Sequence, residues 1–547
     1  MTIIRHLALR KDYVFVWLAL VLMGLAYRPL TPVDETRAVT VAWEMWSQHQ
    51  WLVPHLNGEP YSHKPPLLLW GINLMWLVFG VNEWSARLLP SLFALGNLLL
   101  TERLARRLWP EAKSSARLAP WLLLAMPVWA MWSSLTLYDM LTTTFVLVGL
   151  HGISRAGRGE TRIGWIWAGL GIGGGVLAKG PVILLLVLPV ALGAPWWGAL
   201  RPDAGWGNWY RGLLGAVLLG AAMGLAWAIP AGFAGGEEYR RMIFWGQSAG
   251  RIANAFAHQR PVWWYLEILP LLMFPWVLWP PLWRGLRRIQ FDPGLRFCAL
   301  HAASVFLIFS LISGKQVHYL LPALPSAALL LARLLGRGDQ PAIRNDQVYV
   351  GFLLLVVGLA FTLIPVAGSL FGLPESLEDA VHIADAAPLT AKLVLLLSGI
   401  FLLRGQPGSR YGAVRALTLS MLALLFSAHL VYRQVGWTYY DMLPFAQRLS
   451  AVQQQERDVA YFGKYSGDFQ FLGRLERRLE EIEASEAFVD WLKRHPEDYA
   501  VIIHRHKEKR LEEGAEFGQF YRGSRRITLW KAAELVARPD VLKELME

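Results

Sequence analysis

Apolar residues gather in long runs that are separated by short polar segments over most of the chain. A helix needs about 20 mostly apolar residues to span a bilayer. Because lipid offers no partner for free backbone groups, and no run alternates with the period of a barrel strand, each such run predicts a helix. We count thirteen candidate spans, centred on 12–29, 84–104, 117–133, 135–153, 163–179, 181–199, 211–233, 261–283, 295–313, 316–335, 347–371, 388–404 and 412–432.

The polar segment 30–80 interrupts this pattern after the first span. It has amphipathic character and carries Trp43, Trp46 and Trp51. Tryptophan is enriched at the membrane–water interface, so the segment predicts helices that lie in that interface. The apolar stretch 67–79 is too short for a span, which predicts an interfacial or re-entrant helix.

The C-terminal segment 436–547 is much more polar than the rest of the chain. Its patterns predict strands at 458–462, 499–504 and 526–530, with helices at 474–484 and 486–495. We therefore expect a membrane domain over 1–435 and a small soluble α/β domain over 436–547.

Composition supports a membrane protein of mainly α class. Of the 547 residues, 54% are hydrophobic and 17% are charged, against roughly a quarter charged in soluble domains. A soluble protein of this length needs several polar surfaces, and this balance excludes it. The single cysteine, Cys298, excludes a disulfide framework and a cysteine-based zinc site.

The charge of the loops orients the chain. Lys and Arg number 53 against 41 Asp and Glu, and every loop predicted to be inside is basic. The predicted outer loops 133–138 and 372–387 contain no Lys or Arg. The positive-inside rule then predicts a cytoplasmic N-terminus, retained as a signal anchor, and a C-terminal domain on the outer face.

Polar residues beside the spans cluster on the predicted outer face. Ionisable groups are costly in a membrane, so they are functional candidates by default. Six separated segments contribute them: Asp34 and Glu35; His63 and Lys64; Asp139; Lys179; Arg240, Arg241, Arg251, His258 and Arg260 of the loop 234–261; and Lys315, His318 and Tyr319.

This set of residues suits chemistry on a lipid phosphate. Several lysines and arginines form a phosphate pocket, and they stabilise the charge that develops on a departing phosphate. A nearby carboxylate takes a proton from an incoming nucleophile. Transfer of a group from a lipid phosphate to an acceptor is thus the first hypothesis. A transporter or flippase is the alternative, although transporters place their charges near the midplane.

Each candidate residue also has a purely structural interpretation. Asp34 and Asp139 could cap the helices that follow them, and Lys64 could anchor the chain at the headgroups. Lys179-Gly180-Pro181 could be punctuation between two spans. Glu35 is expected to be an interfacial surface charge.

Six motifs together resemble a known family. They are VDETR at 33–37, SHKPPLLLW at 62–70, LYDM at 137–140, AKGP at 178–181, AHQRPVWWYLEILP at 257–270 and GKQVHYLLPALP at 314–325. The chain resembles the bacterial aminoarabinose transferases, which belong with the protein O-mannosyltransferases among membrane glycosyltransferases of the GT-C class. The resemblance covers residues 1 to roughly 335 in order.

The resemblance implies an inverting glycosyltransferase of the bacterial inner membrane with a periplasmic site. Its donor would be a polyprenyl-phosphate-linked sugar, and its acceptor lipid A, another envelope glycan or, as in the O-mannosyltransferases, a protein; nucleic acid is not an expected partner. Asp34 would be nearest the chemistry, and Asp139 would lie in the pocket. The residues implied to bind substrate and phosphate are Lys64, Lys179, Arg260, His258, Lys315, His318 and Tyr319.

A divalent metal is the one cofactor that the resemblance raises. The aminoarabinose transferases usually have Glu before Lys-Pro-Pro, and that Glu with a loop His resembles a metal site. This chain has His63 instead. His63 and His258 would make a partial pair, and two ligands are not a site.

Overall fold

The computed structural model describes residues 11–198, 205–246, 259–336, 344–371, 378–505, 509–523 and 525–546. The chain forms two compact units. Unit 1 comprises Met1–Ala26, Ser62–Leu68 and Arg87–Val431, and unit 2 comprises Tyr27–Tyr61, Leu69–Ala86 and Tyr432–Glu547. Both units therefore combine segments that lie far apart in the sequence.

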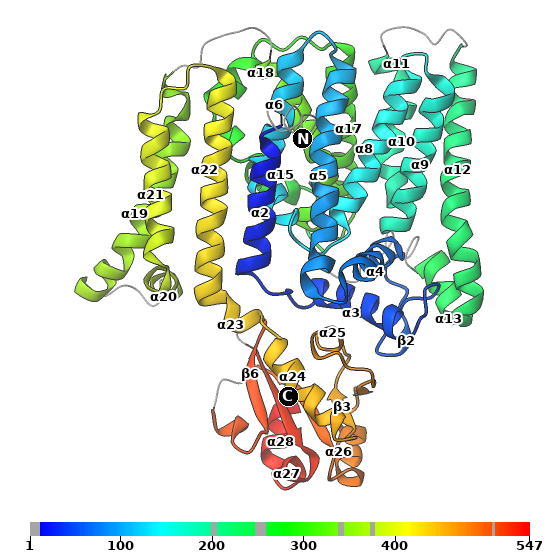
Figure 1. Cartoon of the computed structure of the whole chain (residues 1–547), viewed down its shortest axis with the longest axis vertical. Coiled ribbons are helices and arrows are strands. Elements are labelled where there is room, and N and C mark those ends of the chain that lie inside the picture. Colours follow the sequence, from blue (N-terminus) through cyan, green and yellow to red (C-terminus); the bar gives the residue numbers. More distant parts are fainter. Residues whose placement is uncertain are drawn as a thin grey trace. The chain divides into compact units, whose positions relative to one another are not determined.

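Unit 1 is helical (Figure 1). Its elements, some of which extend a few residues beyond it, are α2 (Tyr13–Tyr27), α5 (Glu83–Leu108), α6 (Lys113–Leu124), α7 (Pro127–Trp132), α8 (Asp139–Ala156), α9 (Thr161–Lys179), α10 (Val182–Leu192), α11 (Ala194–Trp197), α12 (Gly205–Ala234), α13 (Gly236–Arg241), η1 (Met242–Gly246), α15 (Trp264–Leu272), η2 (Trp276–Leu278), α16 (Pro280–Leu286), α17 (Pro293–Leu311), η3 (Val317–Ala323), α18 (Leu324–Leu335), η4 (Arg344–Gln347), α19 (Val348–Phe371), α20 (Glu378–Ala386), α21 (Leu389–Arg404) and α22 (Arg410–Val431).

Six helices of the described chain are long and apolar enough to cross a membrane, or seven if the bent pair α20–α21 is one span. A multi-pass helical membrane protein is thus confirmed, and the count of thirteen stays a prediction. Several predicted spans are divided into shorter helices. The span 117–133 is α6 and α7, and 261–283 is α15, η2 and α16. Proline explains both divisions, because it removes a backbone donor and ends or kinks a helix.

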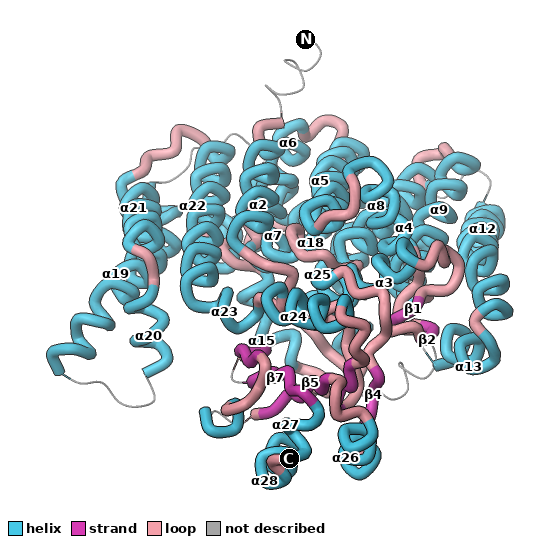
Figure 2. The backbone as a smooth tube through the Cα atoms, turned by 60° about the horizontal axis from the view of Figure 1, so that its bottom comes forward, coloured by secondary structure: helices cyan, strands magenta, loops and turns pink. Residues whose placement is uncertain are grey.

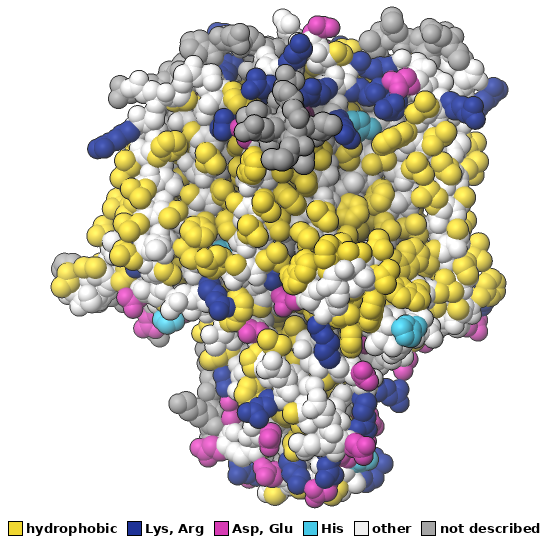
Figure 3. Space-filling model, viewed as in Figure 1, with side chains coloured by type: hydrophobic (Ala, Val, Ile, Leu, Met, Phe, Trp, Pro, Cys, Tyr) yellow, Lys and Arg dark blue, Asp and Glu magenta, His cyan; other side chains and the backbone are white. Residues whose placement is uncertain are grey.

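The outer helices of unit 1 present apolar side chains to their surroundings. Leu218 and Phe233 of α12 are exposed, as are Phe352 and Leu370 of α19. Figure 3 shows hydrophobic side chains over these helices and Lys and Arg gathered at one end of unit 1. Exposed apolar helices flanked by a basic end are what a lipid-embedded protein presents.

The antiparallel helices α8 and α9 pack closely because glycines face each other. A Cβ atom on Gly152 would lie 2.3 Å from the backbone nitrogen of Ala168, and one on Gly164 would lie 2.5 Å from that of Ala156. Small residues let two membrane helices approach in this way. The pairing places the start of α8 beside the end of α9.

Unit 2 contains a five-stranded sheet of order β4-β3-β5-β7-β6. The strands β3, β4 and β5 are parallel, whereas β7 is antiparallel to β5 and β6. Helix α24 covers one face and α26, α27 and α28 the other (Figure 2). The C-terminal elements are α23 (Trp437–Tyr440), α24 (Leu443–Gln454), β3 (Val459–Phe462), α25 (Gln470–Gly473), β4 (Glu480–Ile482), α26 (Ser485–Arg494), β5 (Tyr499–His504), η7 (Lys509–Glu512), β6 (Phe517–Tyr521), β7 (Arg525–Lys531), α27 (Ala532–Val536) and α28 (Pro539–Met546), preceded by η6 (Tyr432–Gly436).

The three predicted strands correspond to β3, β5 and β7, and the helix predicted at 486–495 corresponds to α26. The helix predicted at 474–484 is wrong, because β4 lies there and pairs with β3. The charged residues of this stretch repeat like an exposed helix. Pairing with a neighbouring strand overrides that local preference.

The remaining elements of unit 2 come from the first polar segment: α3 (Asp34–Ser47), β1 (His55–Leu56), β2 (Glu59–Pro60) and α4 (Leu67–Phe79), which begins in unit 1. The C-terminal part of unit 2 holds α3 through polar contacts that are buried or partly buried. The Thr36 hydroxyl donates to Asp468 Oδ1 at 3.1 Å, and Trp43 Nε1 donates to the Leu475 carbonyl at 3.2 Å. The Arg37 guanidinium donates to the Ser466 carbonyl at 3.0 Å.

The hairpin β1–β2 is fixed from both sides. Glu44 of α3 accepts hydrogen bonds from the backbone nitrogens of Asn57 and Gly58, at 2.6 and 3.0 Å. The Asn57 side chain donates to the Leu479 carbonyl and accepts from the Leu479 nitrogen, both at 2.8 Å. Within unit 2, the first polar segment and the C-terminal segment therefore share one polar core.

Candidate active site

The centre of the candidate site in unit 1 is an ion pair between two helix ends. Asp139 is the first residue of α8 and Lys179 the last of α9. Lys179 Nζ lies 2.6 Å from Asp139 Oδ1, and the two side chains are 17% and 5% exposed. Tyr138, rather than Asp139, is the N-cap of α8. The carboxylate is thus engaged by a lysine, and the capping interpretation of Asp139 is wrong.

Gly180 explains why Lys179 ends its helix at this point. Its backbone has φ of +84°, a conformation that side-chain-bearing residues rarely adopt, and Pro181 then starts the next helix. Lys179-Gly180-Pro181 therefore ends one helix and begins the next, as its structural interpretation predicts. The same motif places the Lys179 ammonium beside the Asp139 carboxylate.

A second lysine brings the charge of the site above neutrality. Lys64 Nζ lies 5.8 Å from the centre of the Tyr138 ring, next to Asp139 in sequence. The charges of Lys179 and Lys64 both act on the Asp139 carboxylate, as does that of His318 when it is protonated. Two lysines against one carboxylate leave net positive charge, which suits an anionic ligand.

The segment η3 adds aromatic groups to this cluster. His318 stacks on Trp132 of α7 with ring centres 6.0 Å apart, and its edge meets the Tyr319 ring at 4.8 Å. Lys179 Nζ lies 5.2 Å from the centre of the Tyr319 ring. Trp132 Nε1 is buried and has no hydrogen-bond partner among the described residues. Sequence reasoning missed Trp132, although its place just before the predicted outer loop 133–138 was a signal.

Lys315 has a different environment from Lys64 and Lys179. It is buried, and its ammonium donates to the carbonyls of Arg260 and Ile312, at 3.0 and 2.5 Å. The backbone adds a bridge between Gln259 and Gly314. Through these contacts Lys315 joins the segment that contains Arg260 to the segment that follows α17. Arg260 itself is exposed and lies 5.7 Å from the centre of the Trp264 ring.

Asp34 lies in unit 2, at the first position of α3, where its side chain is 73% exposed. Val33 is the N-cap residue, so the capping interpretation of Asp34 is wrong as well. A guanidinium nitrogen of Arg37, three residues further along α3, lies 3.7 Å from Asp34 Oδ1. Glu35 is buried in an ion pair with Arg28, which corrects the expectation of a surface charge.

Of the two histidines proposed as metal ligands, the structure describes His63 but not His258. His63 is exposed in unit 1, and His258 lies outside the described residues, as does Arg251. Among the described residues, no group of three or more His, Cys, Asp or Glu side chains is placed to hold a metal ion. The described donor set therefore does not fit a metal site, and we derive no step through a metal.

Within unit 1 the structure brings together five predicted site residues, Lys64, Asp139, Lys179, His318 and Tyr319. A buried carboxylate with surplus cations and neighbouring aromatic rings, at one end of a helical unit, is the arrangement expected of one class of protein: a membrane enzyme that handles a lipid-borne phosphate.

Comparison with known proteins agrees with this class. Residues 63–226 match the family model of dolichyl-phosphate-mannose-protein mannosyltransferases. The chain is 30% identical over 440 residues to the undecaprenyl phosphate-alpha-4-amino-4-deoxy-L-arabinose arabinosyl transferase of Pseudomonas paraeruginosa, covering 78% of this chain and 73% of that protein. It is 31% identical over 396 residues to arabinosyl transferase 1 of Pseudomonas fluorescens, covering 69% and 68%.

The fold is similar to that of a solved structure, ArnT from Cupriavidus metallidurans bound to undecaprenyl phosphate. The TM-score is 0.72 at 20% identity, over 95% of this chain and 98% of that chain. The protein belongs to the undecaprenyl phosphate-alpha-4-amino-4-deoxy-L-arabinose arabinosyl transferase family. It is thus a glycosyltransferase and a multi-pass protein of the inner membrane.

Proposed function

We propose that this protein transfers 4-amino-4-deoxy-L-arabinose from undecaprenyl phosphate to lipid A at the periplasmic face of the inner membrane, with inversion at the sugar. The observation that carries the proposal is the Asp139–Lys179 pair with Lys64 beside it, a cationic cluster around one buried carboxylate. Membership of the arabinosyl transferase family supports the donor and the sugar.

The leaving group explains the cations. In the reaction, the bond between the anomeric carbon and the phosphate oxygen breaks, and its electron pair stays on undecaprenyl phosphate. Lys64 and Lys179 stabilise the negative charge that develops there. Asp139 holds Lys179 in place through the 2.6 Å contact, so that the ammonium is oriented before the donor arrives.

The acceptor decides whether a base is needed. Its oxygen attacks the anomeric carbon from the face opposite the phosphate and forms the new glycosidic bond. A lipid A phosphate is already ionised and has no proton to lose, so Asp34 then positions the acceptor. A hydroxyl acceptor would instead give its proton to the Asp34 carboxylate, acting as general base.

The test is lipid A mass spectrometry in a strain that lacks its own aminoarabinose transferase but makes the donor. Expression of the wild-type protein should add the mass of one aminoarabinose. Lys179→Met should lower transfer about 10²-fold or more, because a charge-stabilising group is removed. Asp34→Asn should lower transfer to a similar degree, and near-normal product from it would refute its assigned role.

Two substitutions serve as matched controls. Lys392→Met removes a lysine at the start of another helix, and Asp379→Asn removes an acid from α20; both should leave transfer unchanged. Equal amounts of inserted protein show that loss of transfer is not loss of folding. Movement of the donor lipid across vesicle membranes without any glycosylated product would favour the flippase alternative.

A further inference from the structure

A second cationic site lies at the opposite end of the α8–α9 pair from Asp139. A cavity of about 640 Å³ opens there between the end of α5, the end of α8 and the start of α9. On α8 it begins at His151, 12 residues from Asp139, or roughly 18 Å at the rise of an α-helix. Its charged lining consists of Arg103, Arg106, Arg107, Arg155, Arg158 and Glu160.

The arginines of this cavity are incompletely balanced by acids. Arg107 and Arg155 share Glu160, each at 2.6 Å, and Arg106 pairs with Glu102 at 2.5 Å. In the part of the chain that the structure describes, Arg103 and Arg158 form no ion pair within 4.0 Å. Burial, and then the charge of Arg107, lower the pKa of Arg158. An arginine so placed gains from an added anion.

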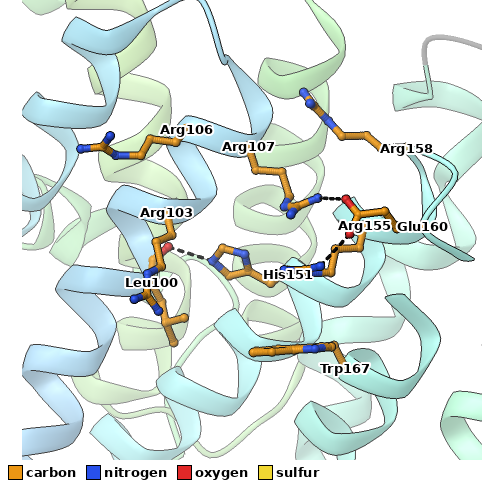
Figure 4. Close-up of a pocket in the computed structure, with 9 residues that line it drawn as sticks. All are labelled: Leu100, Arg103, Arg106, Arg107, His151, Arg155, Arg158, Glu160 and Trp167. Carbon is orange, nitrogen blue, oxygen red and sulfur yellow. Dashed lines mark hydrogen bonds and ion pairs between the residues drawn. The ribbon is translucent and has the colours of Figure 1, made fainter. Parts of the chain in front are cut away.

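The guanidinium groups are arranged in two sets. In Figure 4, Arg103 and Arg106 lie on one side of the cavity and Arg155 and Arg158 on the other, with His151 between the sets. His151 is buried and its Nε2 lies 2.9 Å from the Leu100 carbonyl, so the floor of the cavity is fixed. Two separated arginine sets suit a ligand with two anionic groups, because each guanidinium binds a phosphate through parallel hydrogen bonds.

The cavity also borders the lipid-facing surface of α9. Trp167 lines the cavity, and the centre of its ring lies 5.5 Å from Cζ of the Arg155 guanidinium. Ile163, Ile166 and Leu170 are exposed on the same face of the helix as Trp167. The acyl chains of a lipid whose headgroup lies in the cavity could therefore pack against this exposed apolar face of α9.

We propose that this cavity binds the headgroup of an anionic phospholipid with two phosphodiesters, of the cardiolipin kind, from the leaflet opposite the active site. The positive-inside distribution predicts that this end of unit 1 is cytoplasmic, and basic pockets between membrane helices on that side bind such headgroups. Five arginines supply the charge, and the exposed face of α9 selects a lipid over a soluble phosphate compound.

The test uses native mass spectrometry of the delipidated full-length protein in detergent. Tetraoleoyl cardiolipin, dioleoyl phosphatidylglycerol and dioleoyl phosphatidylcholine are added separately. The wild-type protein should retain cardiolipin best and phosphatidylcholine least. The double variant Arg103→Gln/Arg158→Gln should bind cardiolipin at least about tenfold more weakly, because it loses two charge-assisted contacts. Equal binding by this variant would overturn the proposal.

The controls distinguish specific binding in the cavity from nonspecific attraction to exposed arginines. Arg287→Gln/Arg288→Gln removes two exposed arginines from the same predicted side of the membrane, outside the cavity, and should bind cardiolipin as the wild type does. A tenfold loss in that control would overturn the proposal. So would displacement of cardiolipin by millimolar pyrophosphate, since the ligand would then be a soluble phosphate compound. Binding is measured without donor or acceptor, so this result is independent of the transfer reaction.

Discussion

Lys179 and Lys315 show how two similar residues acquire different roles. Both lysines stand at the predicted outer face beside a span, and the sequence predicts phosphate binding for both. In the structure, Lys179 directs its ammonium at a carboxylate and an aromatic ring, whereas that of Lys315 is taken up by two backbone carbonyls. We therefore propose that Lys179 acts on the substrate and that Lys315 acts on the loop.

Asp468 is a buried acid in unit 2 that sequence reasoning did not single out. Its carboxyl accepts hydrogen bonds from Thr36 and from the Tyr521 hydroxyl, at 3.1 and 3.0 Å. Burial raises the pKa of Asp468 to about 6, despite these two bonds and the opposing charges of Arg37 and Arg522. The phenols of Tyr461 and Tyr465 are its other titratable neighbours.

This pKa predicts how the stability of unit 2 depends on pH. The folded state binds the proton more tightly than the unfolded state, so the contribution of Asp468 to the free energy of unfolding is greatest at low pH. It is lost as the pH rises from about 4 to about 6, and the total change is roughly 3 kcal/mol at 1.36 kcal/mol per pKa unit. Hydrogen exchange of residues 466–471, followed by mass spectrometry, measures this loss.

Two variants make that measurement specific. Asp468→Asn cannot ionise, so the local stability of its segment should depend less on pH than that of the wild type. Asp490→Asn, an exposed acid on α26, should keep the wild-type dependence. A pH dependence that is the same in all three proteins would show that Asp468 does not cause it.

At the scale of elements, we propose that the glycine contact between α8 and α9 sets the geometry of the candidate site. Gly152→Leu should separate the two helices, because the backbone of Ala168 leaves no room for a side chain. We expect a loss of about 1–3 kcal/mol in stability and a larger proportional loss in transfer, since the Asp139–Lys179 distance depends on this packing. Thermal unfolding in detergent and lipid A mass spectrometry measure the two effects.

The matched control is Gly215→Leu in α12. A Cβ atom at Gly215 meets nothing within 4 Å, and the residue is exposed. The same substitution in an apolar helix should therefore leave both stability and transfer near the wild-type level. Similar losses in the two variants would mean that the glycine contact has no special role.

The segment between β3 and β4 affects an element distant in sequence, because it holds α3. Hydrogen bonds from Thr36, Arg37 and Trp43 reach residues 466–475, and Asp34 begins the same helix. We infer that the C-terminal segment positions Asp34 by fixing α3. The periodicity of α3 and the strand patterns after residue 458 do not contain this relation, since it depends on which surfaces meet.

At the scale of the whole molecule, the orientation in the membrane is a prediction that labelling can check. Cys298 is buried, so it gives little background with a membrane-impermeant maleimide. Glu486→Cys, in the C-terminal domain, should be labelled in intact spheroplasts. Glu111→Cys, in a predicted inner loop, should be labelled only after lysis. The opposite pattern would invert the topology and place the candidate site in the cytoplasm.

The sequence by itself determined the class of the molecule. Long apolar runs require helices in lipid whatever their packing, and β3, β5 and β7 follow from short runs rich in β-branched and aromatic residues. The motifs around Asp34, Lys64, Asp139 and Lys179 pointed to phosphate chemistry through residue type alone. These conclusions depend on local pattern and on solvent, which a single sequence displays.

Only the tertiary structure decided which candidate residues lie together in the site and which have a structural role. It paired Asp139 with Lys179, used Lys315 for a loop, buried Glu35 beside Arg28 and turned a helix-like stretch into β4. It also assembled the arginine cavity from three helix ends. Most of these outcomes depend on contacts between segments distant in sequence, and the energy of such a contact belongs to the pair rather than to either segment.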